Sequence, residues 1–239
     1  MNDAGPNVLE IGGLDTSYGR IPMLRGVTLD VPSGHVCCVL GANGAGKTTL
    51  VKAILNMVKA DAGSMKLDGK SMDAWPTHKR VEAGIALSAA AVGTFHKMTV
   101  EANLKMGAYY INDDSLLRER LEEIYISFPV LRERLQQKSG TLSGGERTML
   151  AIARSVINKP KLLILDEPSL GLAPIMVETV FEIIRRLCAQ QMSILLVEQN
   201  AQKALSIATT GYVLQKGAIV FAGSTDELRE SEFAENPVM

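Results

Sequence analysis

The chain has 239 residues, and 46% of them are hydrophobic, so it can bury a sizeable core as one large domain or as a domain with a sizeable insertion. Its 25 Lys and Arg residues nearly balance its 26 Asp and Glu residues, which argues against a global basic field for nucleic acid or an anionic membrane and leaves only local patches open. The N-terminal segment is polar, no apolar run approaches the roughly 18 residues of a membrane span, and the three cysteines have neither metal nor disulfide spacing. These features indicate a globular protein of the reducing cytosol.

The first predicted element is a small antiparallel β structure between Val8 and Val31, where short apolar runs alternate with turns. A short apolar run, Val36 to Leu40, follows it and predicts a buried strand. Beyond residue 48, apolar residues recur at the spacing of one helix face. The order is therefore strand, glycine-rich loop, helix.

The loop between that strand and that helix fits the pattern Gly, four residues, Gly-Lys-Ser/Thr. Its backbone N–H groups and the positive end of the new helix both favour phosphate. Lys47 can reach the β- and γ-phosphates of a nucleotide, and the Thr48 hydroxyl can ligate Mg²⁺. The alternative, a glycine-rich turn that binds nothing, leaves the Lys-Thr pair at the helix start unexplained. The predicted nucleotide-binding residues are Gly41, Ala42, Asn43, Gly44, Ala45, Gly46, Lys47, Thr48 and Thr49.

The next elements are short. Leu67 to Lys70 predicts a strand end and a turn, Thr77 to Ala83 a short helix, and Ile85 to Leu87 another strand. A helical insertion of about 97–157 follows, with one helix near Val100 to Ala108.

A second helix of this insertion is predicted from the apolar stripe between Leu117 and Phe128, and Pro129 marks its end. A further helix opens after Leu142, with Ser143 placed to cap it. The cap is a sufficient structural reason for this serine, although a helix start with two glycines is also an anion site.

Acidic residues follow a continuous apolar strand at Lys161 to Leu165. Asp166 is the expected second contact of a magnesium ion, and Glu167 is the candidate to orient or deprotonate an attacking water. Acids at strand ends are often only solvated, so this pair becomes a strong signal only together with the upstream loop.

The C-terminal third contains an amphipathic helix after Pro174, a buried strand at Ser193 to Val197 and a closing hairpin between Tyr212 and Phe221. Alternating strands and helices predict an α/β fold with a mostly parallel sheet. Ligands bind such sheets at the carboxyl ends of the strands. The glycine-rich loop, Asp166-Glu167 and Glu198-Gln199 all follow predicted strands, so they could share one site.

Three motifs in this order resemble the nucleotide-binding domain of ATP-binding cassette (ABC) proteins, a P-loop NTPase fold with an N-terminal antiparallel β element and a helical subdomain. They are residues 41–48, Leu142 to Glu146 and Leu162 to Leu172, and the resemblance extends from Val8 to about Leu228. More narrowly, five segments are similar to the second ATPase subunit of branched-chain amino-acid importers. These segments are 99–104, 106–109, 171–174, 196–201 and 211–214.

The resemblance implies a single nucleotide-binding domain over residues 1–239 that works as a dimer. Two such domains would close head to tail and trap ATP between the phosphate loop of one and Ser143, Gly144 and Gly145 of the other. Tyr18 matches the aromatic residue that stacks on adenine, with a surface or core tyrosine as the alternative. Gln199 stands where most such domains place a histidine at the γ-phosphate, and its amide can still donate a hydrogen bond.

The sequence departs from the family pattern at two further places. Ala90 stands where a glutamine or glutamate is expected to touch magnesium and sense the membrane subunit, and an alanine side chain cannot ligate a metal. Arg147-Thr148 replaces the usual Gln-Gln or Gln-Arg on a helix surface.

We therefore expect an ATPase that uses MgATP to energise uptake of branched-chain or related amino acids. Its expected partners are integral membrane permease subunits, a related ATPase subunit or a second copy of itself, and indirectly a solute-binding protein, but no nucleic acid. It would lie in the cytoplasm, peripheral on the inner face of the cell membrane. One alternative is a degenerate partner that binds ATP and hydrolyses it weakly, as Ala90 suggests. The other is an ABC ATPase of repair or translation that touches no membrane.

Overall fold

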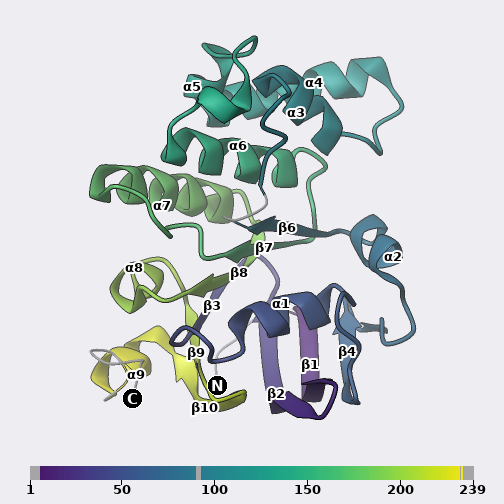
Figure 1. Ribbon diagram of the computed structural model, residues 1–239, viewed down its shortest axis with the longest axis vertical. Coiled ribbons are helices and arrows are strands. Elements are labelled where there is room, and N and C mark those ends of the chain that lie inside the picture. Colours follow the sequence, from purple (N-terminus) through teal and green to yellow (C-terminus); the bar gives the residue numbers. More distant parts are fainter. Residues whose placement is uncertain (1–5, 90–92, 232, 234–239) are drawn as a thin grey trace.

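The computed structural model describes residues 6–89, 93–231 and 233, and its helices and strands form two sheets and a helical end (Figure 1). The first sheet has four antiparallel strands in the order β2-β1-β4-β5. Its strands are β1 (Asn7–Tyr18), β2 (Ile21–Pro32), β4 (Ala62–Leu67) and β5 (Lys70–Ser71). The predicted antiparallel element is therefore confirmed, and two later strands extend it.

Close approach of two backbones explains how β4 joins this sheet. Gly63 has a φ of +99°, and a Cβ built there would lie 2.6 Å from the carbonyl oxygen of Gly13 on β1. Only glycine combines this conformation with this proximity.

The second sheet has six strands in the order β10-β9-β3-β8-β7-β6. Strands β9, β3, β8, β7 and β6 are parallel, and β10 pairs antiparallel with β9. The strands are β3 (Val36–Leu40), β6 (Ile85–Ala89), β7 (Leu162–Asp166), β8 (Ser193–Glu198), β9 (Thr210–Gln215) and β10 (Ala218–Ser224). The predicted mostly parallel sheet and the closing hairpin are both confirmed.

Alternation along β3 gives each face of this sheet its own core. Val36, Cys38 and Leu40 pack among the long helices, whereas Cys37 and Val39 pack against α1 (Lys47–Ile54) and the antiparallel sheet. Successive side chains of a strand point to opposite faces, so a strand covered on both sides must be apolar throughout. This explains the uninterrupted apolar run that the sequence shows.

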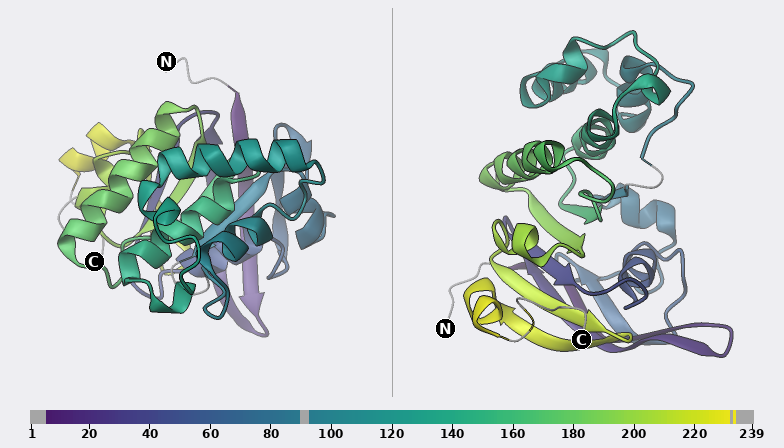
Figure 2. Two further views of the ribbon diagram at one scale, coloured as in Figure 1. Left: turned by 90° about the horizontal axis from the view of Figure 1, so that it is seen from above. Right: turned by 60° about the vertical axis from the view of Figure 1, so that its left-hand side comes forward.

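The remaining helices lie at the flanks and at one end of the molecule (Figures 1 and 2). They are α2 (Thr77–Glu82), α3 (Val100–Gly107), α4 (Asp114–Ser127), α5 (Pro129–Arg132), a 3₁₀ turn (Ser139–Thr141), α6 (Gly144–Val156), α7 (Pro174–Ala189), α8 (Ala201–Leu205) and α9 (Thr225–Glu230). Pro129 ends α4 and starts α5, because proline fits the first turn of a helix but not its interior. The predicted insertion of 97–157 contains α3 to α6, and its status as a separate subdomain stays a prediction.

The segment that leads into these helices is held by a buried amide. Asn103 is fully buried on α3; its side chain accepts from the Phe95 N–H at 2.8 Å and donates to the Thr99 carbonyl at 2.9 Å and the Ser139 hydroxyl at 3.3 Å. Over the described ranges, no helix is both long and apolar enough to cross a membrane.

Candidate functional site

Three neighbouring strands deliver polar residues to one edge of the six-stranded sheet. Strands β3, β8 and β7 lie side by side, and Leu40 at the end of β3 pairs with Glu198 at the end of β8. Asp166 at the end of β7 pairs with Val197. The structure therefore brings together the glycine-rich loop, Asp166-Glu167 and Glu198-Gln199.

The glycine-rich loop wraps around its own lysine. Lys47, the first residue of α1, is only 4% exposed, and its Nζ donates to the carbonyl oxygens of Gly41 at 2.7 Å and Ala42 at 3.0 Å. Gly46, the residue before α1, has a φ of +112°, a conformation that permits this turn. A Cβ built at Gly41 would lie 2.5 Å from the carbonyl oxygen of Leu214 on β9, so this position also requires glycine.

The other predicted members of the loop differ in exposure. Asn43, Gly44 and Thr48 are exposed at the edge, whereas Ala45 and Thr49 are buried. Thr49, in the first turn of α1, can serve a phosphate through its backbone N–H. The start of α1 still presents unpaired N–H groups to an anion.

Glu167 forms an ion pair with the lysine of this loop. Its Oε1 lies 3.0 Å from the Nζ of Lys47, and its backbone N–H donates to the Val197 carbonyl on β8 at 2.8 Å. Its φ of +51° lies in the left-handed region, which is costly for a residue other than glycine. Strain of this kind persists where surrounding contacts fix the residue, and it is concentrated at functional sites.

One carboxylate oxygen of Asp166 is unpaired among the described residues. Its Oδ1 is buried and has no hydrogen-bond partner within the described part of the chain. Burial raises the pKa of this carboxyl group, the negative charge of Glu167 raises it further, and Lys47 opposes that shift. The unpaired carboxylate oxygen of Asp166 and the exposed hydroxyl of Thr48 are both oxygen donors, the type of ligand that Mg²⁺ prefers.

Glu198 forms hydrogen bonds that its position at a strand end did not predict. It is 2% exposed, its Oε1 accepts from the Ser169 N–H at 3.0 Å, and its Oε2 accepts from the Gln199 N–H at 3.1 Å. The side chain of Gln199 is exposed at the same edge. The one sequence signal for Glu198 is an acid that directly ends an apolar buried strand.

Ser143, Gly144 and Gly145 lie at the start of α6, away from the glycine-rich loop of the same chain (Figure 1). The Ser143 hydroxyl accepts from the Glu146 N–H at 3.3 Å, and the Glu146 carboxylate accepts from the Ser143 N–H at 2.8 Å. The predicted cap is thus a reciprocal capping box. Ser143 and Gly144 are exposed, whereas Gly145 is buried and a Cβ there would clash with Met176.

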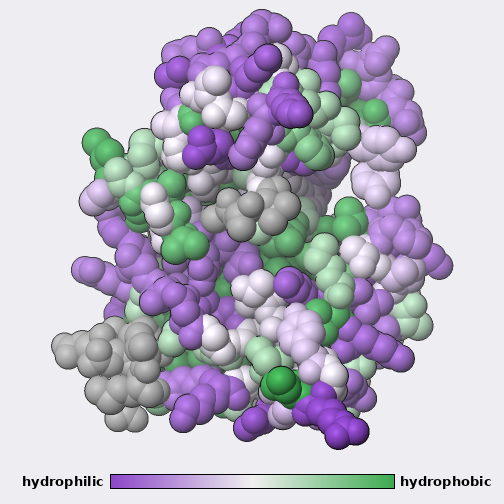
Figure 3. Space-filling view, viewed as in Figure 1, coloured by the Kyte–Doolittle hydropathy of each residue, from purple (hydrophilic) through white to green (hydrophobic). Residues whose placement is uncertain are grey.

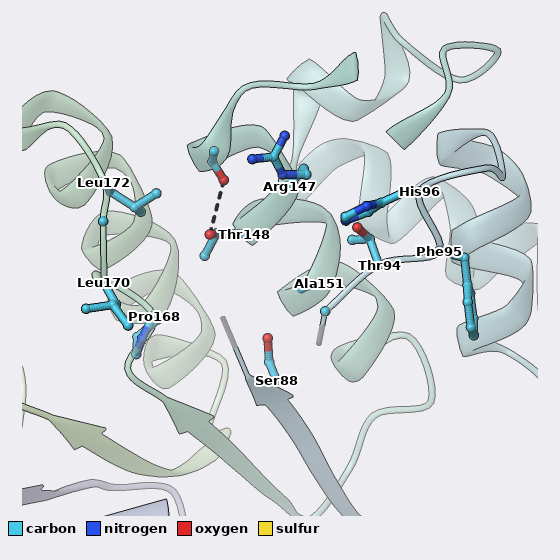
Figure 4. A pocket seen from close by; sticks show the side chains of 13 residues that line it. Ser88, Thr94, Phe95, His96, Arg147, Thr148, Ala151, Pro168, Leu170 and Leu172 are labelled. Carbon is cyan, nitrogen blue, oxygen red and sulfur yellow. Dashed lines mark hydrogen bonds between the residues drawn. The ribbon is translucent and has the colours of Figure 1, made fainter. Parts of the chain in front are cut away.

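A cavity of about 390 Å³ separates the first turns of α6 from the loop that follows β7 (Figure 4). Arg147 and Thr148 lie on its α6 side, with Leu170 and Leu172 opposite and Ser88 below. Arg147 donates to the Leu142 carbonyl at 2.6 Å, so this unusual residue braces the turn before α6.

Two further sequence predictions concern Tyr18 and Ala90. Tyr18 ends β1 at the β1–β2 turn and is 45% exposed, which leaves its ring free to stack. Ala90 lies outside the described residues, so its effect on the site stays a hypothesis from the sequence.

Comparisons with known proteins agree on one family. The pattern of the family described as "ABC transporter" matches residues 24–170. The chain is 41% identical over 213 residues to the high-affinity branched-chain amino acid transport ATP-binding protein BraG of Pseudomonas aeruginosa, covering 89% of this chain and 91% of that protein. It is 38% identical over 220 residues to the probable branched-chain amino acid transport ATP-binding protein LivF of Archaeoglobus fulgidus, covering 92% and 93%.

A solved structure supports the fold. The chain superposes with a TM-score of 0.85 and 24% identity on a nucleotide-free ATP-binding cassette from an ABC transporter, covering 97% of this chain and 98% of that one.

Proposed function

This chain belongs to the ABC transporter family as an ATP-binding subunit, and from that premise we propose that it hydrolyses MgATP to drive uptake of branched-chain or related amino acids. The two relatives named above, 41% and 38% identical over most of both chains, support the choice of solute class. Specificity for the individual solute would reside in the membrane and solute-binding subunits.

The observation that carries the catalytic part is the Lys47–Glu167 ion pair beside the unpaired Oδ1 of Asp166. Loop amides and Lys47 would bind the β- and γ-phosphates, with Tyr18 stacking on the adenine. Thr48 and Asp166 would hold a magnesium ion, which neutralises charge on the phosphate oxygens when bound. Gln199 would donate to the γ-phosphate from the end of β8.

The ion pair also suggests how ATP switches the site on. Lys47 and Glu167 form an ion pair at 3.0 Å. A γ-phosphate in the loop competes for Lys47 with a larger negative charge, so the Glu167 carboxylate is released. It is then free to accept a proton from, or orient, the attacking water.

The dimer is part of the same proposal. Ser143 and Gly144 are exposed at the start of α6, where they can face the phosphate loop of a second subunit, either a related ATPase or a second copy. Leu170 and Ile175, 59% and 74% exposed, flank this region and supply apolar surface for the contact.

A groove near α2, β6 and α3 is the proposed docking site for a membrane permease subunit. Its exposed lining includes Met57, Val81, Met106, Tyr109 and Tyr110. The molecule is hollowed between α2 and the helical end, and apolar residues gather there (Figure 3). Exposed apolar patches of this kind mark protein interfaces, so the chain would sit peripherally on the inner face of the cell membrane.

The test is Mg²⁺-dependent ATP hydrolysis by the purified chain beside its Glu167→Gln variant. We expect hydrolysis to fall about 1,000-fold in the variant while ATP binding is retained, because the amide cannot accept the proton. Glu230→Gln, at an exposed position on α9, is the control and should leave the rate unchanged.

Ala90 favours a second candidate, a degenerate partner that binds ATP but hydrolyses it weakly. Equal, negligible rates in both proteins with retained ATP binding would support that candidate. Uptake of leucine by the assembled transporter then decides between the two. Transport that survives Glu167→Gln contradicts a catalytic role of this chain.

A further inference from the structure

Glu198 is a buried carboxylate that is satisfied by backbone N–H groups. At 2% exposure it forms no ion pair with a Lys or Arg of the described residues. It accepts instead from the N–H groups of Ser169 at 3.0 Å and Gln199 at 3.1 Å, with a longer contact from Asn200 at 3.4 Å. A buried charge is expensive unless such partners stabilise it, so these hydrogen bonds are strong constraints on the loops that donate them.

The donors belong to two different loops. Ser169 lies in the loop between β7 and α7, and Gln199 and Asn200 lie in the loop between β8 and α8. Because Oε1 serves the first loop and Oε2 the second, one rigid carboxylate joins them. A displacement of either loop must break a hydrogen bond or carry the other loop with it.

The two loops have different surroundings. The 168–172 loop lines the cavity against α6 and carries the exposed Leu170, so a neighbouring subunit can reach it (Figure 4). The second loop carries the exposed Gln199 at the edge that holds Lys47 and Glu167.

We propose that Glu198 is a positioning residue that couples the 168–172 loop to Gln199, so that subunit contact at one loop sets the position of the amide at the other. This inference rests on the proposed function, since Gln199 acts there on the γ-phosphate. Glu198 itself touches no substrate, because both of its oxygens are engaged by backbone N–H groups.

The first test measures amide hydrogen exchange of the full chain and its Glu198→Gln variant without nucleotide. Glutamine keeps the shape but replaces one acceptor oxygen with an NH₂ group, so the backbone N–H groups that donate to that oxygen lose their acceptor. We expect exchange to accelerate about tenfold in both loops, in peptides spanning 166–172 and 198–205. Acceleration confined to one loop, or absent from both, overturns the coupling.

Glu227→Gln is the matched control. Glu227 also accepts from a backbone N–H, that of Ser224 at 2.7 Å, but it caps α9 far from this edge. Its variant should leave exchange in both loops and ATP hydrolysis unchanged.

The second test measures ATP hydrolysis in a double-mutant cycle with Gln199→Ala. We expect Glu198→Gln to lower kcat about tenfold with KM for ATP within about twofold, and to cost less than about twofold when Gln199 is already alanine. An equal loss in both backgrounds, or a raised KM alone, contradicts a role through Gln199. A wild-type chain without hydrolysis bears on the proposed function instead, where it favours the degenerate partner, and the exchange measurement still decides the coupling.

Discussion

The two ends of α1 each hold a buried cation, but the two cations are used differently. At the N-terminal end, Lys47 contacts two loop carbonyls and the strained Glu167, next to the unpaired Oδ1 of Asp166. At the C-terminal end, Arg80 on α2 is 1% exposed and donates to the carbonyls of Ala53, Ile54, Met72 and Trp75 at 2.7–3.1 Å.

The difference separates a binding site from a structural contact. The guanidinium group completes the hydrogen bonding of the last carbonyls of α1 and complements the negative end of the helix. Burial lowers the pKa of Arg80, yet its carbonyl partners satisfy the charge. At the N-terminal end, by contrast, the Oδ1 of Asp166 has no partner among the described residues, and the backbone of Glu167 is strained. Both features are expected of a site that binds a ligand. The end of α1 whose polar neighbours lack hydrogen-bond partners is therefore the end that we assign to ligand binding.

The largest effect is expected from Arg80→Met, which removes a charged donor from four carbonyls and leaves the Ile54 carbonyl without another donor among the described residues. We expect the free energy of unfolding to fall by about 4 kcal/mol, because several buried hydrogen bonds from a charged donor are lost together and one buried acceptor is left unsatisfied. ATP affinity of the folded fraction should be unchanged. Denaturant unfolding and nucleotide titration measure the two quantities.

Two further variants sharpen this result. Lys79→Met, at an exposed neighbouring position, should change stability by less than about 0.5 kcal/mol. Arg80→Lys keeps the positive charge but loses the planar guanidinium group with its several donors. The resulting loss of stability should lie between those of Arg80→Met and Lys79→Met. A stable Arg80→Met protein with weakened ATP binding would invert the comparison between the two ends.

The second effect concerns Lys47→Ala at the other end of the same helix. We expect ATP affinity to fall about 100-fold, because a charged hydrogen-bond donor to the phosphates is lost. Stability should fall less than for Arg80→Met, since water can reach the 19% exposed Glu167 side chain. Isothermal titration calorimetry with ATP measures the affinity, and denaturant unfolding measures the stability.

Lys52→Ala, exposed on the same helix, is the matched control and should bind ATP like the wild type. Equal ATP affinity of Lys47→Ala and Lys52→Ala would remove Lys47 from the binding site.

The smallest effect is expected from Asp166→Asn in the nucleotide-free, magnesium-free chain. Burial and the neighbouring Glu167 raise the pKa of this carboxyl group in the folded state above its usual 3.8. The folded chain therefore holds a proton more tightly than the unfolded chain, and stability falls as pH rises from 3.8 through the raised pKa. Asparagine removes this penalty, so the variant should unfold at a higher temperature at pH 7.

The same variant should hydrolyse MgATP more slowly, because it loses a charged magnesium ligand. Thermal unfolding at pH 7 and at pH 3.5 provides the check on stability. The gain should appear at pH 7 and shrink at the lower pH. A variant that is less stable than the wild type at pH 7 contradicts the interpretation of Asp166 as a buried carboxylate that costs stability and serves as a magnesium ligand.

The sequence predicted the elements of both sheets better than their arrangement. Apolar runs marked β3, β7 and β8, and turn residues marked the closing hairpin. Nothing in these runs indicated that β4 and β5 extend the antiparallel sheet, since that pairing depends on the contact between Gly63 and Gly13.

What the sequence determined by itself was local. The phosphate loop, the capping box of Ser143 and Glu146, and the break at Pro129 depend on residues a few positions apart, whose spacing fixes their geometry. The tertiary structure alone decided which buried charges meet. The Lys47–Glu167 pair, the carbonyl cage of Arg80 and the two loops joined by Glu198 depend on strand order and on helix packing. Periodicity shows that a residue is buried, but only packing across the sheet selects its partner.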